Sequence, residues 1–174
     1  MVKDSALRIF WLRLTYLLIA LSLILLQTLP IHTSQYQFIK PDFLLIITYA
    51  WIMRRPDVMG PILITIAFLF TDFILQRPPG LWTLITLCGS MFLKMRVLDF
   101  KEVVFFYEWL LVAIVVTLNF ILYHFALLLT FLPMHNLKLY ILHAFLTLIT
   151  YPIFIWIFKP ILRYSIHNTL KKKA

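Results

Sequence analysis

The sequence predicts an all-α integral membrane protein with six transmembrane helices and both termini in the cytoplasm. Of its 174 residues, 63% are hydrophobic and only 13% are charged, a balance that ordinary soluble domains do not have. The apolar residues form six runs, which are separated by short segments containing proline or charged residues. The basic residues are dense in alternate segments and sparse in the others, as in polytopic membrane proteins.

The six runs are the expected spans of a single domain that covers residues 1–174. A helix needs about 20 mostly apolar residues to cross the hydrocarbon core. The first run is longer than a secretory signal core and has no small-residue cleavage site, so we expect it to stay as an anchor. The fifth run is so long that its helix must tilt, kink or end early, at about residues 125–129. The spans are expected at residues 9–29, 41–53, 60–75, 81–93, 103–129 and 139–158.

The second and fourth runs, residues 41–53 and 81–93, are too short to cross a bilayer unaided. Lys40, Asp42 and Lys94 at their ends can extend toward the headgroups, and local thinning of the bilayer would cover the rest. A four-span arrangement, in which both runs are re-entrant or interfacial segments, stays open.

Two bends divide the central stretch, residues 41–93, into three helices. Each bend contains proline, which lacks a backbone donor and disfavours helical geometry in the residue before it. Gly60 and Gly80 lie near these prolines and can turn sharply. The bends are Arg54-Arg55-Pro56-Asp57 and Gln76-Arg77-Pro78-Pro79-Gly80.

The basic residues predict the orientation, because short loops rich in Lys and Arg stay in the cytoplasm. Six spans place thirteen basic residues on the side of the termini and three on the other side. The net charge of +9 therefore indicates topology, and the scattering of these residues over short loops argues against nucleic-acid binding. The basic and apolar tail after residue 158 suits an anionic lipid surface. Residues expected to set the topology include Arg54, Arg55, Lys94 and Arg96.

Sequence motifs for catalysis are absent: there is no phosphate-binding glycine loop, no nucleophile elbow and no zinc-protease motif. Cys88 is the only cysteine, so the chain cannot form an internal disulfide, and we expect this residue to be buried in the fourth span. The five histidines are dispersed without ligand spacing. We therefore expect no enzymatic activity, no metal and no cofactor.

Two acidic residues of the central stretch are candidates for function, because a carboxylate is costly in hydrocarbon. Asp42 follows Pro41 at a helix start, where it can cap the first turn or serve a partner. Asp72 lies inside its helix, so we expect it either to pair with Arg77 or Lys40 or to hold a partner or a ligand. Polar stripes on several spans indicate helix packing, or alternatively a polar cavity or a partner groove. The stripes include Thr83, Thr86 and Ser90, then Glu108, Asn119 and Tyr123, then His143, Thr147, Thr150 and Tyr151.

Four motifs of the central stretch carry a family resemblance. They are Pro-Asp-Phe-Leu-Leu at residues 41–45, Arg-Arg-Pro at 54–56, Gly-Pro at 60–61 and Thr-Asp-Phe-Ile-Leu-Gln-Arg-Pro-Pro-Gly-Leu-Trp at 71–82. This pattern resembles the family of the rod shape-determining protein MreD. The rest of the chain matches that family only in length, hydropathy and inferred topology. Many members have more glycine around the acid of the third span, where this chain has Ala67, Phe68 and Gln76.

The resemblance implies a non-enzymatic, multi-pass inner-membrane component of the bacterial cell-elongation machinery. The partners that it implies are the bitopic protein MreC, the actin-like filament protein MreB, and the wall-synthesis pair of RodA and a class B penicillin-binding protein. The fold that it implies is similar to the substrate-binding membrane subunits of energy-coupling-factor transporters. The family-like positions, which we expect to shape a surface or cavity for a partner helix, are Asp42, Asp72, Arg77, Pro78, Pro79, Gly80 and Trp82.

A transport function is the second hypothesis, since a substrate-binding subunit of a vitamin transporter has a similar architecture. Such a subunit needs a pocket that faces outward, and the candidate lining residues are Gln35, Tyr36, Gln37 and Trp82. A lipid-acting enzyme, the third class, would need a clustered base or metal set that the sequence lacks.

Overall fold

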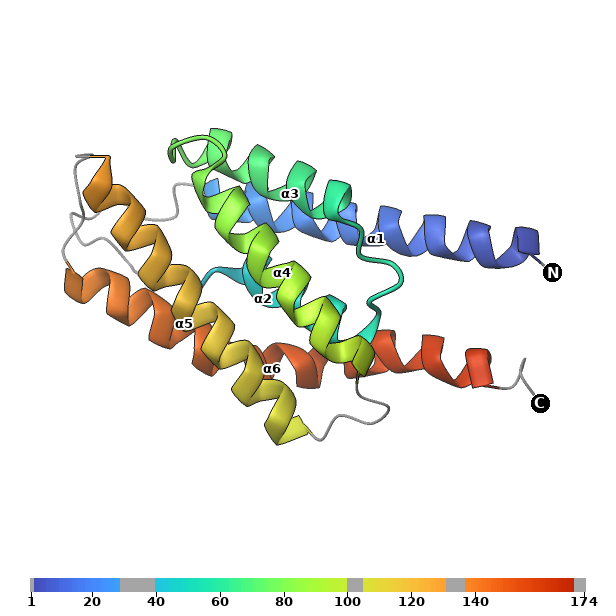
Figure 1. Ribbon diagram of the computed structural model, residues 1–174. Coiled ribbons are helices and arrows are strands. Elements are labelled where there is room, and N and C mark those ends of the chain that lie inside the picture. The colour runs from blue at the N-terminus through green and yellow to red at the C-terminus, as the bar shows by residue number, and fades with distance from the viewer. Residues whose placement is uncertain (1, 29–39, 100–104, 131–136, 171–174) are drawn as a thin grey trace.

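The computed structural model describes residues 2–28, 40–99, 105–130 and 137–170 (Figure 1). This part of the chain contains six helices and no strand, so the predicted all-α class is confirmed. The helices follow the six apolar runs in the predicted order. They are α1 (Val2–Thr28), α2 (Phe43–Arg54), α3 (Pro61–Ile74), α4 (Leu81–Asp99), α5 (Phe105–Leu129) and α6 (Leu137–Leu170).

Within the described residues, three helices are long and apolar enough to cross a membrane. These segments are Leu7–Thr28, Leu81–Leu98 and Phe105–Leu129, and shorter apolar helices occupy Phe43–Arg54, Pro61–Ile74 and Ile141–Trp156. The prediction of a short fourth span is wrong, because α4 continues beyond residue 93 to Asp99. Lys94 is accommodated within this helix by a hydrogen bond from its Nζ to the carbonyl of Met59, at 2.7 Å. The fifth helix ends at Leu129, as its length required.

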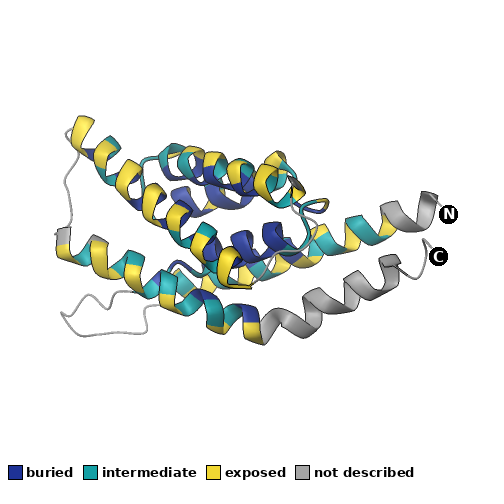
Figure 2. Cartoon of the chain, turned by 60° about the horizontal axis from the view of Figure 1, so that its bottom comes forward, coloured by how far each residue is buried: buried dark blue, intermediate teal, exposed yellow. Residues whose placement is uncertain are grey.

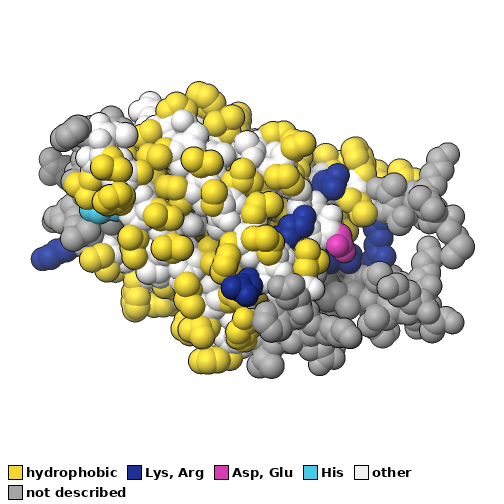
Figure 3. All heavy atoms as spheres, viewed as in Figure 1, with side chains coloured by type: hydrophobic (Ala, Val, Ile, Leu, Met, Phe, Trp, Pro, Cys, Tyr) yellow, Lys and Arg dark blue, Asp and Glu magenta, His cyan; other side chains and the backbone are white. Residues whose placement is uncertain are grey.

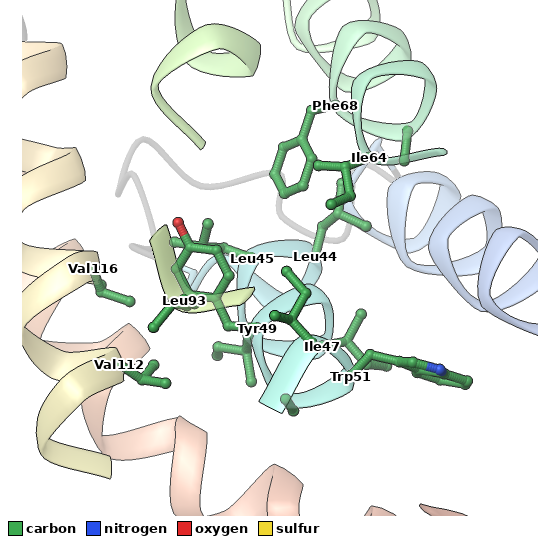
Figure 4. Packing of buried hydrophobic residues seen from close by; sticks show 14 of the residues in the cluster. Leu44, Leu45, Ile47, Tyr49, Trp51, Ile64, Phe68, Leu93, Val112 and Val116 are labelled. Atoms are coloured by element: carbon green, nitrogen blue, oxygen red, sulfur yellow. The ribbon is translucent and has the colours of Figure 1, made fainter. Parts of the chain in front are cut away.

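Helix α2 is the centre of the bundle and packs against α1, α4 and α6. Every residue from Leu44 to Met53 is buried, as expected of a helix that is apolar on all sides. Figure 4 shows Leu44 on the side of Ile64 in α3 and Tyr49 pointing toward Val116 in α5. With 12 residues, α2 is about 18 Å long and shorter than a hydrocarbon core of about 30 Å. The sides of α2 are covered by the neighbouring helices and not by lipid. Its length therefore does not have to match the thickness of a bilayer.

The outer helices expose large hydrophobic side chains, which Figure 2 shows as exposed residues along their outward faces. Trp11 of α1, Leu118 of α5 and Trp156 of α6 are examples. Hydrophobic side chains cover most of the described surface in Figure 3, an arrangement typical of a protein surrounded by lipid. Cys88 also lies on the exposed side of α4, so its predicted burial is wrong, because Gly89 and Ser90 occupy the buried side of that helix.

Polar contacts join the core helices at mid-length. The hydroxyls of Tyr16 in α1 and Thr48 in α2 are hydrogen-bonded at 2.9 Å. The Asn119 side-chain amide of α5 donates to the hydroxyl of Tyr49 in α2. Gly89 of α4 faces this second pair, and a Cβ atom at Gly89 would lie 2.7 Å from the Tyr49 hydroxyl oxygen. Glycine at this position therefore permits the close approach of three helices.

The two bends follow from their turn residues. In the first bend the amide of Val58 donates to the carbonyl of Arg55 at 3.2 Å, which leaves Pro56 at a turn position that suits proline. Pro61 then opens α3 as the first helical residue. In the second bend, α3 ends in a Schellman arrangement: the amides of Gln76 and Arg77 donate back to the carbonyls of Phe73 and Asp72. Gln76 has a φ of 52°, which is a position that normally favours glycine.

Candidate functional site

Asp42 caps the central helix. Its Oδ1 accepts a hydrogen bond from the amide of Leu45 at 3.1 Å, so the capping role open to it from sequence is confirmed. Its Oδ2 lies 3.8 Å from Arg77 Nη1, and its own amide donates to Thr147 Oγ1 of α6 at 3.2 Å. The buried carboxylate at the positive end of the α2 dipole thus joins the start of α2 to the second bend, and the backbone amide of Asp42 joins it to α6.

Asp72 caps the next helix rather than its own. Its Oδ2 accepts from the amide of Gly80 at 3.1 Å, and from the amide and hydroxyl of Thr83 at 3.2 Å and 2.7 Å. These groups form the start of α4, whose first amides have no partner within the helix. Among the described residues Asp72 forms no ion pair, so the expected pairing with Arg77 or Lys40 is wrong; Arg77 pairs with Asp42 instead.

Arg77 and Trp82 complete this end of the bundle. The Arg77 guanidinium carbon lies 5.4 Å from the centroid of the Trp82 ring, within the range of a cation–π contact. The Trp82 ring packs against Phe120 and Tyr123 of α5, with ring centroids 5.3 Å and 5.0 Å apart. Trp82 is only 1% exposed, so it is a core residue that joins α4 to α5 and has little surface left for an external ligand.

The structure therefore brings together the residues of two central motifs, at 41–45 and 71–82, whereas the motifs at 54–56 and 60–61 lie at the first bend. We call Asp42, Asp72, Arg77, Gly80, Trp82 and Thr83 the capping site. Gly80 has a φ of 86°, a conformation that L side chains rarely adopt. Pro78 accepts a hydrogen bond from the amide of Leu81 at 3.2 Å, while Pro79 is exposed at the rim of the bend. Gln35, Tyr36 and Gln37, the other candidates for a pocket, lie outside the described residues.

A second polar cluster, which sequence reasoning missed, lies at the other end of α2. Arg54 Nη2 lies 3.2 Å from Glu108 Oε2, and Arg54 Nε donates to Glu108 Oε1 at 3.3 Å. The hydroxyl of Tyr151 donates to the same Oε1 at 3.2 Å. The two-point arginine–carboxylate contact ties α2 to α5, and the Tyr151 hydroxyl adds α6; Glu108 is buried. The sequence did contain a signal for this cluster. Glu108 is the one acidic residue in the apolar fifth run, and a carboxylate in such a run needs a polar or charged partner.

The basic residues expected to set topology also have structural contacts. Arg54 holds Glu108, and Lys94 donates to the carbonyl of Met59 at 2.7 Å. Arg13 of α1 donates to the carbonyl of Val58 at 3.1 Å. The Arg96 guanidinium lies 5.3 Å from the Phe92 ring centroid. Two cations from different helices therefore hold the carbonyls of the first bend.

The described residues contain no group of three His, Cys, Asp or Glu side chains that could hold a metal ion. Comparisons with protein-family models, curated proteins and solved structures find no match. The class that the fold and the capping site define is an all-helical protein with apolar helices suited to a membrane, in which buried carboxylates join helix ends.

Proposed function

We propose that this chain is a six-span, non-enzymatic scaffold of the bacterial inner membrane, a member of the MreD family of the cell-elongation complex. It supports cell shape and lateral peptidoglycan synthesis by docking the bitopic protein MreC. Through this contact it links RodA and a class B penicillin-binding protein to the cytoplasmic MreB filament. Both termini lie in the cytoplasm.

The observation that carries this proposal is the capping site. Residues of two of the four family-like motifs, at 41–45 and 71–82, join α2, α3 and α4 at one end of the bundle. Asp72 is 0% exposed and Asp42 is buried, so their polar atoms act within the chain. These buried contacts hold the second bend in place, and an ordered bend supports a role in docking a partner.

The rim of the second bend is the best candidate for the docking surface. Phe73 of α3 is 64% exposed, and Leu84 of α4 and Pro79 of the bend are also exposed. Because α3 and α4 pack together, these side chains offer an apolar surface beside a rigid bend. A partner transmembrane helix has the matching chemistry, since helices associate in lipid through close packing.

The positions of the first and last helices support six spans. The start of α1 and the end of α6 lie at the same end of the bundle (Figure 1), as an even number of crossings requires. Most of the Lys and Arg side chains visible in Figure 3 also gather toward that end. The short α2 spans as an enclosed helix, and α3, with 14 residues, is about 21 Å long and requires local thinning of the bilayer.

Site-specific photo-crosslinking tests the docking surface. A photoreactive residue replaces Phe73, and a matched control replaces Trp156 of α6, which is 77% exposed. We expect Phe73 to crosslink the membrane segment of MreC and Trp156 not to do so. Equal crosslinking at both positions, or crosslinking only at Trp156, would overturn the assignment of this face.

A further inference from the structure

Helix α6 contains a proline in its interior. Pro152 lies well inside the helix, which begins at Leu137 and continues to Leu170. Proline lacks the amide that would bond the carbonyl of Leu148, four residues earlier, and its ring crowds that carbonyl. Sharp kinks in helices occur mainly at such prolines. The turn that ends at Pro152 is therefore a weak point of the α6 backbone.

Two threonines just before this proline add to the weakness. The hydroxyl of Thr147 donates to the carbonyl of His143 at 2.8 Å. The hydroxyl of Thr150 donates to the carbonyl of Leu146 at 2.6 Å. Side-chain bonds of this kind, to the carbonyl four residues earlier, often bend helices. We call residues 147–152 the α6 turn; both threonine bonds and the proline favour bending there.

Contacts from both ends of α2 hold the α6 turn. The amide of Asp42, the residue that caps α2, donates to Thr147 Oγ1 at 3.2 Å. The hydroxyl of Tyr151 donates to Glu108 Oε1 at 3.2 Å, and the same carboxylate binds Arg54, the last residue of α2. Thr147 and Tyr151 are each only 1% exposed. Two buried tethers therefore fix a helix turn whose own backbone is weakened.

The tether at Thr147 is continuous with the second bend. Asp42 Oδ2 lies 3.8 Å from Arg77 Nη1, and Arg77 belongs to the bend beside the proposed docking surface. The backbone of Asp42 thus contacts α6 while its side chain contacts the bend. The helix that follows Asp42 is enclosed by protein and contains no glycine or proline, so it moves as a unit. A displacement of Arg77 reaches the α6 turn through this one residue.

The part of α6 beyond the turn extends past the rest of the core. Figure 1 shows the red, C-terminal part of α6 continuing beyond the ends of α3 and α4. From Pro152 to Leu170 the helix is about 27 Å long. A small change of direction at the α6 turn therefore becomes a large displacement at the end of the helix.

We propose that the α6 turn is a hinge that sets the direction of the C-terminal part of α6, and that a partner bound at the second bend changes this direction through Asp42. The second half of this proposal rests on the proposed function, in which the second bend is the docking surface. When a partner draws Arg77 away, Asp42 shifts and its amide releases Thr147, so the turn bends about Pro152. Hinges of this kind need only a few residues that absorb the change of direction. Docking at one end of the bundle then moves α6 at the other end.

Distance measurements between spin labels test the hinge on the full chain in lipid nanodiscs. The background is Cys88→Ser, because Cys88 is exposed and would be labelled as well. One label is attached at Ile114→Cys, an exposed position of α5. The second is attached at Ser165→Cys beyond the turn or, as a matched control, at Phe145→Cys before it. Residue 165 lies about 20 Å along the helix from the turn, so a change of about 20° moves it by about 7 Å.

Three variants release the turn in different ways. Thr147→Val and Tyr151→Phe each remove one tether at nearly constant side-chain volume, and Arg77→Gln releases the side chain of Asp42. We expect each variant to shift or broaden the distance to residue 165 by about 7 Å and to leave the distance to residue 145 unchanged. Adding Pro152→Ala, which restores the missing amide, should abolish the shift.

Unchanged distances to residue 165 in both tether variants would overturn the hinge. Equal shifts at residue 145 would mean that α6 moves as a whole and would also overturn it. A shift in the tether variants without one in Arg77→Gln would refute the link to the second bend. Circular dichroism confirms folding, and Asp42→Asn, which weakens the same ion pair, replaces Arg77→Gln if that variant fails to fold.

These measurements contain no partner protein, so they are independent of the crosslinking test at Phe73. Loss of the crosslink with an intact hinge would refute the docking surface alone. A retained crosslink with a rigid α6 would refute the hinge alone.

Discussion

Replacing Asp72 with leucine should destabilise the isolated protein. The Asp72 Oδ2 accepts three hydrogen bonds from Gly80 and Thr83, and the Asp72→Leu variant leaves their donors unmet at the start of α4. Removing a capping acceptor costs about 1 kcal/mol, and each buried donor left unpaired costs about 1 to 3 kcal/mol. The same substitution removes Asp72 Oδ1, a buried oxygen that has no hydrogen-bond partner among the described residues. Its removal offsets part of the cost. We expect a net loss of about 3 kcal/mol in the free energy of unfolding.

The assay is reversible unfolding by sodium dodecyl sulfate in mixed micelles, followed by circular dichroism. Asp72→Asn keeps one oxygen in place and should lose about 1 kcal/mol, since only the charge is removed. Thr83→Val removes the hydroxyl donor alone and should also lose about 1 kcal/mol. Phe73→Leu, at an exposed neighbour on α3, is the control and should change little.

The result that would refute the reasoning is an Asp72→Leu variant with unchanged unfolding free energy. If that variant also failed to bind its partner, Asp72 would be a docking residue rather than a helix cap.

Three further predictions use the same unfolding assay. Gly89→Ala should cost about 1 to 3 kcal/mol, because its Cβ would lie 2.7 Å from the Tyr49 hydroxyl oxygen; an unchanged midpoint would mean that the helices can separate freely. Gln76→Gly should gain about 0.5 to 1 kcal/mol by relieving a positive φ, whereas Gln76→Ala should gain nothing; equal effects would contradict this. Glu108→Gln should cost about 3 kcal/mol by leaving Arg54 without its buried countercharge, and the double variant Glu108→Leu with Arg54→Met should recover most of it. If the double variant is no more stable to unfolding than Glu108→Gln, the loss of stability does not come from the unpaired Arg54.

The helices could be predicted from the sequence because their signals are local. Six apolar runs, with prolines and glycines between them, gave the order of the helices and the end of the fifth near residue 129. The length of α4 was missed because Lys94 and Arg96 looked like the end of an apolar run. Lys94 is accommodated by the carbonyl of Met59, 35 residues away in the chain, which a single sequence does not indicate.

The enclosure of α2 did have a signal in the sequence. Its run from residue 44 to 53 has no polar face, and a helix that is apolar on every side is normally surrounded by protein or lipid. The short length of this run then favours protein as the surrounding, because a lipid-facing helix needs about 20 residues.

The residues of the candidate site could be named from the sequence, but most of the contacts between them could not. Asp42 as a cap follows from its place at a helix start, and this was confirmed. Asp72 caps α4 through Gly80 and Thr83, 8 and 11 residues later, so the contact depends on how the bend folds back. The pair of Arg54 and Glu108 depends on the packing of α2 against α5 and α6, which no local pattern encodes.

The measurement that tests the proposed function most directly is affinity purification of the tagged chain from mild detergent, with the bound proteins identified by mass spectrometry. The scaffold proposal predicts recovery of MreC together with RodA and a class B penicillin-binding protein. Recovery of an ATPase pair with a coupling membrane subunit, and no wall-synthesis protein, would contradict it and favour a vitamin-capture subunit.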